Sequence, residues 1–255
     1  MSLRTKREGR LLRITLDRPE KRNALNSDLC RELLARMEEA DADRGIGAIL
    51  LDAAGSIFCS GMDLEESLLP DAADRNALHK SLFSLGQRIH TPLIASVHGA
   101  ALAGGIGLVA TAHIALSSED AWFSLPEIRI GMFPFVLWRP LVLAIGERRA
   151  LELSLTGRKF AAPEAVAMGL VHGIIPATEL ATRAEGLAHE LSERSPEAVR
   201  RGLALVHESR EMSLNDALDH ADRLRARMFQ SPDYREGVWA FQEKRQPRWP
   251  SLQEE

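Results

Sequence analysis

Four glycines gather in residues 92–113, PLIASVHGAALAGGIGLVATAH. The stretch begins as a short apolar run behind a proline, passes Gly99, and continues through Gly104, Gly105 and Gly107 into small residues of helical character. This order predicts a strand, a tight turn and the start of a helix. The first N–H groups of a helix have no intrahelical partner, and glycine lets a ligand atom approach them, so an oxyanion could bind here. The alternative is that the glycines only allow close packing of helix and sheet.

Two further stretches carry groups that could do chemistry. In residues 57–64, IFCSGMDL, an apolar entry leads to a small-residue corner at Gly61, where a sharp turn could point the N–H of Met62 toward a ligand. In residues 123–135, FSLPEIRIGMFPF, the carboxyl of Glu127 stands between hydrophobic neighbours in an expected loop. Together these stretches offer backbone donors and one carboxylate.

Short strands and helices alternate over about the first three quarters of the chain, and the remainder is purely helical. Asn26 or Ser27 can cap a first helix, and Ser195-Pro196-Glu197 is a strong signal for a helix start. We expect strands at 10–16, 47–52, from 93, 114–118 and 170–175, a mobile loop with a short helix at 65–80, and helices at 77–89, 141–145, 148–155, 163–168 and from 180 to about 241. Such alternation predicts sheet layers with right-handed crossovers.

Composition predicts a soluble cytoplasmic protein with a large core. The chain has 255 residues, 45% of them hydrophobic, and a net charge of −4, which disfavours nucleic acid or an anionic membrane surface as a partner. No apolar run approaches the ~20 residues of a membrane span, and no signal peptide is evident. Cys30 and Cys59 are expected to be free buried thiols. No CxxC, HxxxH or HExxH pattern occurs, so no metal site is predicted.

Several motifs together resemble the crotonase superfamily, also called the enoyl-CoA hydratase/isomerase family. They occur in the family's order over nearly the whole chain: RPEKRNALN (18–26), FCSGMDL (58–64), PLIASVHGAALAGGIGL (92–108), FSLPEIRIG (123–131), GERRALELSLTGRKFAAPEAVAMGLVHGIIP (146–176) and the closing FQEKRQP. Any one of these motifs is a weak signal, whereas the ordered set is specific.

The resemblance implies an α/β fold, a crotonase-like spiral of ββα units with a C-terminal helical trimerisation region. Residues 1–195 would form the spiral core with the acyl-CoA site, and residues 196–255 the helical oligomerisation region. The partner would be an acyl-CoA substrate, with coenzyme A as part of the thioester and no separate cofactor. The assembly would be a homotrimer or a dimer of trimers.

The resemblance also assigns candidate site residues. In the family, two backbone N–H groups polarise the thioester carbonyl, and these positions fall on Met62 and Gly104. Removing one such donor typically costs ~2.7–4 kcal/mol of barrier stabilisation. The residues expected to contact coenzyme A are Met62, Asp63, Leu64, Glu65, Gly104, Arg22 and Ala24.

One departure from the family pattern bears on the reaction. Hydratases of the family carry two glutamates; this sequence keeps one as Glu127 and has Gly107 at the place of the other. Hydration is well served by two carboxylates, whereas moving a double bond from the 3,4 to the 2,3 position needs one base, which Glu127 can supply. After Gly131, bulky apolar residues replace the glycine-rich stretch usual in hydratases. We therefore expect an enoyl-CoA isomerase, with a hydratase or other lyase-type member, or a catalytically idle CoA-ester-binding trimer, as alternatives.

Overall fold

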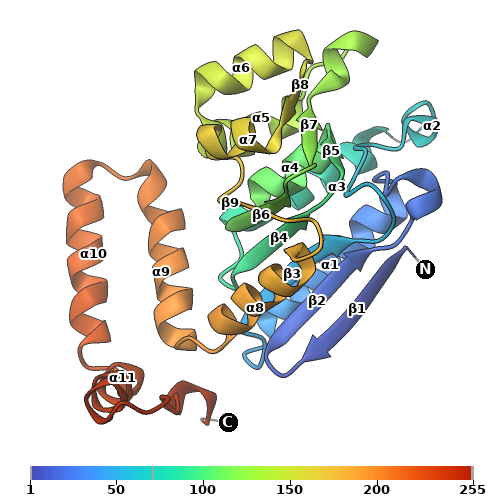
Figure 1. The fold of residues 1–255 in the computed structure, drawn as a ribbon. Helices are drawn as coiled ribbons and strands as arrows, with labels where there is room; N and C mark the ends of the chain where they lie inside the picture. Colours follow the sequence, from blue (N-terminus) through green and yellow to red (C-terminus); the bar gives the residue numbers. More distant parts are fainter. Residues whose placement is uncertain (1, 71, 254–255) are drawn as a thin grey trace.

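A six-stranded sheet forms the centre of the computed structural model, which describes residues 2–70 and 72–253 (Figure 1). In spatial order its strands are β1 (Leu3–Glu8), β2 (Leu11–Leu16), β3 (Ala48–Ala53), β4 (Leu93–Val97), β6 (Ile114–Ser118) and β9 (Gly173–Ile175). β1 pairs with β2 in antiparallel fashion, and the other neighbours are parallel. Parallel neighbours require crossovers, so helices cover both faces of the sheet.

The two faces of this sheet pack into separate cores because successive strand residues point to opposite sides. One face packs against α8 (Leu180–Ser192) through Leu11, Ala48, Leu50, Ile94, Ala184 and Ala188. The opposite face, which includes Ile49 and Leu51, belongs to the main core together with α1 (Ser27–Ala42). Near-continuous burial of β3 and β4 is typical of parallel strands covered on both sides.

A smaller sheet and four helices complete the core. The sheet contains β5 (Ala100–Leu102), β7 (Trp122–Ser124) and β8 (Lys159–Ala161). The helices are α4 (Gly104–Thr111), α5 (Trp138–Ile145), α6 (Glu147–Thr156) and α7 (Ala162–Met168). Between β3 and β4 lie α2 (Leu64–Ser67) and α3 (Ala72–Phe83). Among the described residues, no helix has the length and apolarity needed to cross a bilayer.

The chain ends in a helical arm, which we define as α9 (Pro196–Glu208), α10 (Leu214–Met228) and α11 (Pro232–Glu243). Figure 1 shows α9 and α10 side by side, next to the sheet rather than on top of it. Ser195 caps α9 by accepting a hydrogen bond from the N–H of Ala198 at 3.1 Å, as the Ser-Pro-Glu signal predicted. Asn26 likewise caps α1.

Several sequence-based boundaries were wrong, and each error has a physical cause. The strand predicted at 10–16 is β2, and β1 precedes it; β1 buries only Leu3 fully and therefore lacks an alternating apolar pattern. β5, β7 and β8 have three residues each, too few for such a pattern. The expected loop at 123–135 thus begins in β7 and continues through 3-10 turns at Pro126–Ile130 and Phe135–Leu137.

The helix predicted at 77–89 is also misplaced. α3 begins at Ala72, within the expected loop, and ends at Phe83; a separate 3-10 turn at Leu85–Gln87 follows. At Gly86 the backbone touches the next helix, since a Cβ atom there would lie 1.8 Å from the carbonyl oxygen of Thr111. This close approach is a tertiary contact that residue periodicity does not reveal.

Candidate active site

The corner at Met62 is held between two neighbouring segments. Leu25 donates its N–H to Gly61 O at 2.7 Å and accepts from the N–H of Asp63 at 3.0 Å. Because Leu25 bonds to the residues on either side of Met62, the backbone groups of Met62 itself point away from it. Gly61 has φ +94°, a conformation that favours glycine and makes the corner possible.

The amino end of α4 lies against this corner. Cys59 and Ala101 form an isolated parallel β-bridge. Two residues after Cys59, a Cβ atom on Gly61 would lie 3.1 Å from the backbone nitrogen of Gly104. Gly104 is the first residue of α4, so its N–H has no acceptor four residues back. The structure therefore brings the Met62 and Gly104 segments together, and their role as a pair of oxyanion donors remains a prediction.

Glu127 is positioned by the small sheet. Leu102 lies opposite Ser124, and the N–H of Ala103 donates to Ser124 O at 3.0 Å, so the turn that carries Glu127 follows directly beside the start of α4. Two hydrogen bonds to Gly157 O fix this turn: Ser124 Oγ donates at 2.9 Å and Arg129 Nη2 at 2.7 Å. Register thus brings the segment that carries Glu127 close to the glycine-rich helix start, and the approach of its carboxyl to Met62 and Gly104 stays a prediction.

The carboxyl of Glu127 is partly withdrawn from water. Its Oε2 is buried and has no hydrogen-bond partner among the described residues. Burial raises the pKa of Glu127, and a hydrogen bond from its own backbone opposes this only in part. A carboxyl whose pKa is raised by burial accepts a proton more readily than an ordinary carboxylate, which is what a general base requires.

A side chain at position 107 would overlap two neighbouring side chains as they are packed here. A Cβ atom there would lie 2.5 Å from Leu137 Cδ2 and 2.7 Å from Phe83 Cε1. The same phenyl ring reaches the start of α4, because a Cβ atom on Gly104 would lie 3.3 Å from Phe83 Cζ. An apolar wall of Phe83 and Leu137 therefore fills the space where a longer side chain from Gly107 would extend.

The residues expected to contact coenzyme A lie in two segments that the structure joins. Arg22 O accepts from Ser60 N–H at 3.0 Å, and Ala24 O accepts from Arg18 Nη1 at 2.7 Å. Arg18 also lies 3.4 Å from Asp63, which caps α2 by accepting from the N–H of Glu65 at 3.2 Å. Leu64 is exposed beside them. The six residues other than Gly104 thus share one rim of the Met62 corner, and their contact with coenzyme A stays a prediction.

Sequence reasoning missed Asn23, which holds this rim together. Its side chain is fully buried, donates to the carbonyl oxygens of Ala54 and Ile57 at 2.9 and 2.8 Å, and accepts from the N–H of Arg18 at 2.9 Å. Its φ of +53° lies in the left-handed region, where asparagine is enriched among non-glycine residues. An asparagine just after a Pro-Glu-Lys turn was the available signal.

The cysteines and His98 are not part of this chemistry. Burial raises the pKa of both Cys30 and Cys59 to about 12, and both thiols are free, as expected. Cys59 instead accepts a weak hydrogen bond from the N–H of Gly61 at 3.5 Å. His98 Nε2 lies 2.9 Å from Gly55 O, so this histidine forms a contact within a turn.

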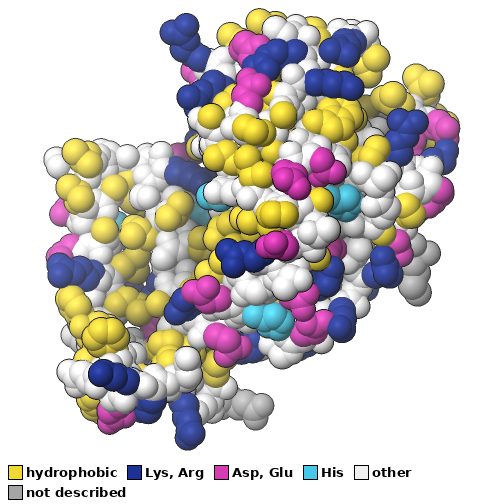
Figure 2. Space-filling view, in the orientation of Figure 1, with side chains coloured by type: hydrophobic (Ala, Val, Ile, Leu, Met, Phe, Trp, Pro, Cys, Tyr) yellow, Lys and Arg dark blue, Asp and Glu magenta, His cyan; other side chains and the backbone are white. Residues whose placement is uncertain are grey.

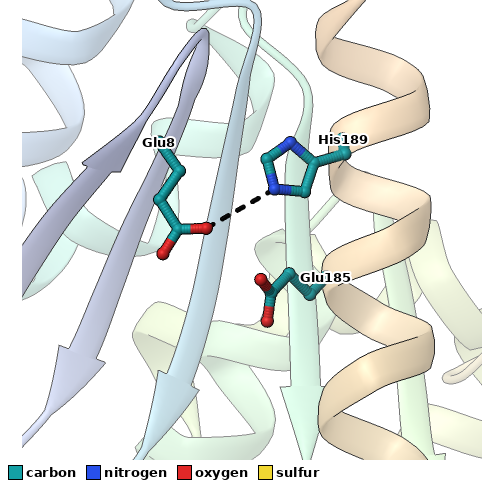
Figure 3. A group of neighbouring side chains, drawn as sticks. All are labelled: Glu8, Glu185 and His189. Atoms are coloured by element: carbon teal, nitrogen blue, oxygen red, sulfur yellow. Dashed lines mark ion pairs between the residues drawn. The ribbon is translucent and has the colours of Figure 1, made fainter.

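One group of side chains outside the site could geometrically meet a cation. Glu8 on β1 approaches Glu185 and His189 on α8, and ligand atoms from the three lie within 4.8 Å of one another (Figure 3). Lys6 already pairs with Glu8, and Arg13 lies 3.5 Å from Glu185. These protein cations satisfy the carboxylates, so we treat the group as a network of surface ion pairs.

Comparison with known proteins identifies the family. The family model described as enoyl-CoA hydratase/isomerase matches residues 6–252. The chain belongs to the enoyl-CoA hydratase/isomerase family. It is 36% identical over 247 residues to a Mycobacterium bovis protein named "Probable enoyl-CoA hydratase echA8", covering 95% of each chain. It is 33% identical over 255 residues to enoyl-CoA hydratase EchA19 of Mycobacterium tuberculosis, covering 95% of this chain and 94% of the relative.

Solved structures agree with this assignment. An enoyl-CoA hydratase from Mycobacterium smegmatis superimposes with a TM-score of 0.91 at 31% identity, covering 98% of this chain and 99% of the other. An enoyl-CoA hydratase from Bacillus anthracis gives 0.91 at 26% identity, covering 98% and 99%. The α/β architecture is therefore the crotonase fold, and the chain is a member of an enzyme family that acts on enoyl-CoA thioesters.

Proposed function

We propose that this family member is an enoyl-CoA isomerase that converts a 3-enoyl-CoA to a 2-enoyl-CoA with Glu127 as its one base. The observation that carries the proposal is the Phe83–Leu137 wall at Gly107. In this packing the side chains of Phe83 and Leu137 fill the space beside Gly107, where a second carboxylate would have to lie to activate water, and Oε2 of Glu127 has no hydrogen-bond partner among the described residues. A single base is sufficient for an allylic proton shift and is poorly suited to hydration.

In the proposed reaction, the thioester oxygen accepts hydrogen bonds from the N–H groups of Met62 and Gly104. Glu127 removes a proton from C2, and the electrons move toward the thioester oxygen to give a dienolate. The two donors stabilise the negative charge that develops there. The protonated carboxyl of Glu127 then returns the proton to C4, and the double bond forms between C2 and C3. The apolar wall excludes water from the carbons that react.

A hydratase is the second candidate, favoured by the printed names of the relatives. The two reactions are separated by mixing purified protein with 3-hexenoyl-CoA and, in parallel, with 2-hexenoyl-CoA. An isomerase generates the absorbance of the conjugated thioester from the first and leaves the second unchanged. A hydratase consumes the absorbance of the second. Glu127→Gln should reduce isomerisation by about 10²–10⁴-fold; an undiminished rate in this variant, or hydration without isomerisation, contradicts the proposal.

We also infer a homotrimer or dimer of trimers, working in the cytoplasm. The helical arm exposes large apolar side chains, and Figure 2 shows such side chains gathered over this part of the surface. The most exposed of them on α10 and α11 are Leu214, Leu218, Trp239 and Phe241. Contiguous exposed apolar residues are typical of subunit interfaces. Light scattering after size exclusion tests the assembly, and a monomer at micromolar concentration would rule it out.

A further inference from the structure

A cavity of about 380 Å³ lies at the opposite end of the sheet from the candidate active site. Arg10, Gly47 and Pro92, which come just before β2, β3 and β4, line it, whereas Met62 and Gly104 follow the far ends of β3 and β4. Six strand residues span about 20 Å, so the two places are well separated. Figure 1 shows the connection from α8 to α9 passing this end of the sheet.

The cavity is rich in arginine although the chain as a whole is acidic. Lys and Arg number 32 in the chain against 36 Asp and Glu. Around the cavity the balance reverses, with arginines 10, 44, 194, 200 and 201 against Glu197 and Asp233. The first turns of α9 and α11 also line it, and helix amino ends favour anions.

Both carboxylates of the cavity already have partners. Glu197 accepts from Arg201 Nε at 2.9 Å. Asp233, which is almost fully buried, accepts from the hydroxyls of Ser195 and Ser251 at 2.5 and 2.8 Å, and from the N–H of Ser251 at 3.0 Å. These bonds tie α9, α11 and the C-terminal turn together. Glu193 and Asp233 still favour the charged form of Arg10 from nearby, but neither carboxylate accepts a hydrogen bond from it.

Two of the arginines keep donors unused. Arg10 donates from Nη1 to Ser192 O at 2.5 Å, but its Nε is buried and has no acceptor within the part of the chain that the structure describes. Arg44 lines the cavity from an exposed position, and its guanidinium meets no acceptor among the described residues. By contrast, Arg200 is held by Asp41, and Arg194 by Glu190 outside the cavity. A buried guanidinium N–H without an acceptor is costly, and a bound anion would supply one.

We propose that this cavity binds a small phosphate ester or polyphosphate, with phosphate oxygens accepting from Arg10 and Arg44. Planar guanidinium groups match phosphate oxygens in geometry and charge. The aliphatic side chains of Ile46, Leu191 and Val199 line the same cavity and would contact the rest of the ligand. Its volume falls near the lower end of small-molecule sites, roughly 300–1,000 Å³. A ligand held there would bridge the sheet and the helical arm, so binding stabilises their contact.

Calorimetry and thermal unfolding of the native assembly with inorganic phosphate, pyrophosphate and fructose 1,6-bisphosphate test the site. We expect at least one probe to bind one per chain, to raise the melting temperature, and to bind more weakly at higher salt. Preference for pyrophosphate over the sugar bisphosphate would indicate an inorganic or diphosphate ligand, and the reverse preference a phosphate ester. These probes lack an acyl thioester, so the outcome does not depend on the proposed isomerase activity.

Substitutions make the test specific. Arg44→Ala, at an exposed position, should weaken binding at least tenfold because it removes charged donors. Arg10→Lys keeps the charge but loses the guanidinium, and should also weaken binding. Arg31→Ala is the matched control, since Arg31 lies on α1 and pairs only with Asp28. No binding of any probe, binding unchanged in both cavity variants, equal loss in the control, or preference for citrate over all phosphates overturns the proposal.

Discussion

The phenyl ring of Phe83 on α3 occupies the space beside Gly107 on α4. A Cβ atom on Gly107 would lie 2.7 Å from Phe83 Cε1 and 2.9 Å from Cδ1, closer than real Cβ contacts allow. α3 and α4 therefore approach each other at a point where a side chain on Gly107 would require Phe83 to shift. Because the ring also reaches Gly104, any change at Gly107 that moves Phe83 acts on the candidate oxyanion corner as well.

Gly107→Ala should destabilise the protein by roughly 1–3 kcal/mol, because the added methyl group overpacks the contact with Phe83 and Leu137. Gly186 on α8 is the control, since a Cβ atom there meets nothing within 4 Å. Gly186→Ala should raise stability by up to about 1 kcal/mol through helix propensity. Urea denaturation measures both values. We expect the free energy of unfolding to fall for Gly107→Ala and to rise for Gly186→Ala. A stabilised Gly107→Ala variant would refute the packing argument.

The coupling between these helices can be measured directly. In a double-mutant cycle, Gly107→Ala should cost less when Phe83→Ala is already present, because the overlap with the ring has been removed and only that with Leu137 is left. We expect a favourable interaction energy of roughly 0.5–3 kcal/mol, the range found for residues in contact. Additive changes would mean that the two residues do not meet.

The rate of the proposed isomerisation should rise with pH through the raised pKa of Glu127. The base must be ionised to accept the C2 proton, and burial keeps it protonated above its ordinary value of 4.5. The measurement is kcat/KM against pH for a 3-enoyl-CoA. We expect an acidic limb above pH 4.5, absent from the residual rate of Glu127→Gln. A limb at or below the ordinary carboxyl value would contradict the burial.

Glu127→Gln should make the folded protein more stable at neutral pH while abolishing most activity. The folded pKa of Glu127 is raised by burial, so the folded state holds the proton to higher pH than the unfolded chain. Wild-type stability therefore falls relative to the variant as pH rises from about 4.5 through the folded pKa. Denaturation at pH 5 and pH 8 measures this difference. Glu119→Gln, at an exposed position, should show no such gain.

Asn23→Ala should loosen the rim of the candidate site. The change removes two donated and one accepted hydrogen bond and leaves the carbonyls of Ala54 and Ile57 without these partners. We expect a loss of roughly 2–4 kcal/mol in the free energy of unfolding, with a higher KM for acyl-CoA. Asn76→Ala, on the exposed face of α3, is the control and should change neither quantity.

The sequence sufficed for the family and the fold because its motifs are ordered turns whose chemistry is local. Gly61, Asn26 and Ser195 each fix a corner or a helix start through their own backbone or side chain, and all three predictions were correct. The predictions that were wrong depended on contacts between residues far apart in the sequence. The end of α3 at Phe83, the approach of Gly86 to Thr111 and the wall beside Gly107 join residues that periodicity cannot relate.

The histidines between the sheet and α9 should make folding sensitive to acid. His113 accepts the N–H of Leu93 through Nδ1 at 2.9 Å, and its ring stacks 6.3 Å from that of His207. Burial, with a contribution from His207, lowers the pKa of His113 to about 4. Burial also lowers the pKa of His207, while Arg210 adds positive charge nearby and Asp41 negative charge. Both rings are therefore expected to be neutral in the folded protein at pH 7.

As pH falls from about 6.5 to about 4, His113 becomes protonated in the unfolded chain but stays neutral in the folded protein. A shift of this size costs roughly 3 kcal/mol of folding stability across that window. His113→Asn keeps a short acceptor for Leu93 but cannot titrate, so its free energy of unfolding should fall less steeply over the same range. Chemical denaturation at pH 7, 6, 5 and 4 compares the slopes. If the free energies of unfolding of the wild type and the variant fell equally with pH, His113 would be protonated in the folded state as readily as in the unfolded chain, and burial beside α9 would not protect it.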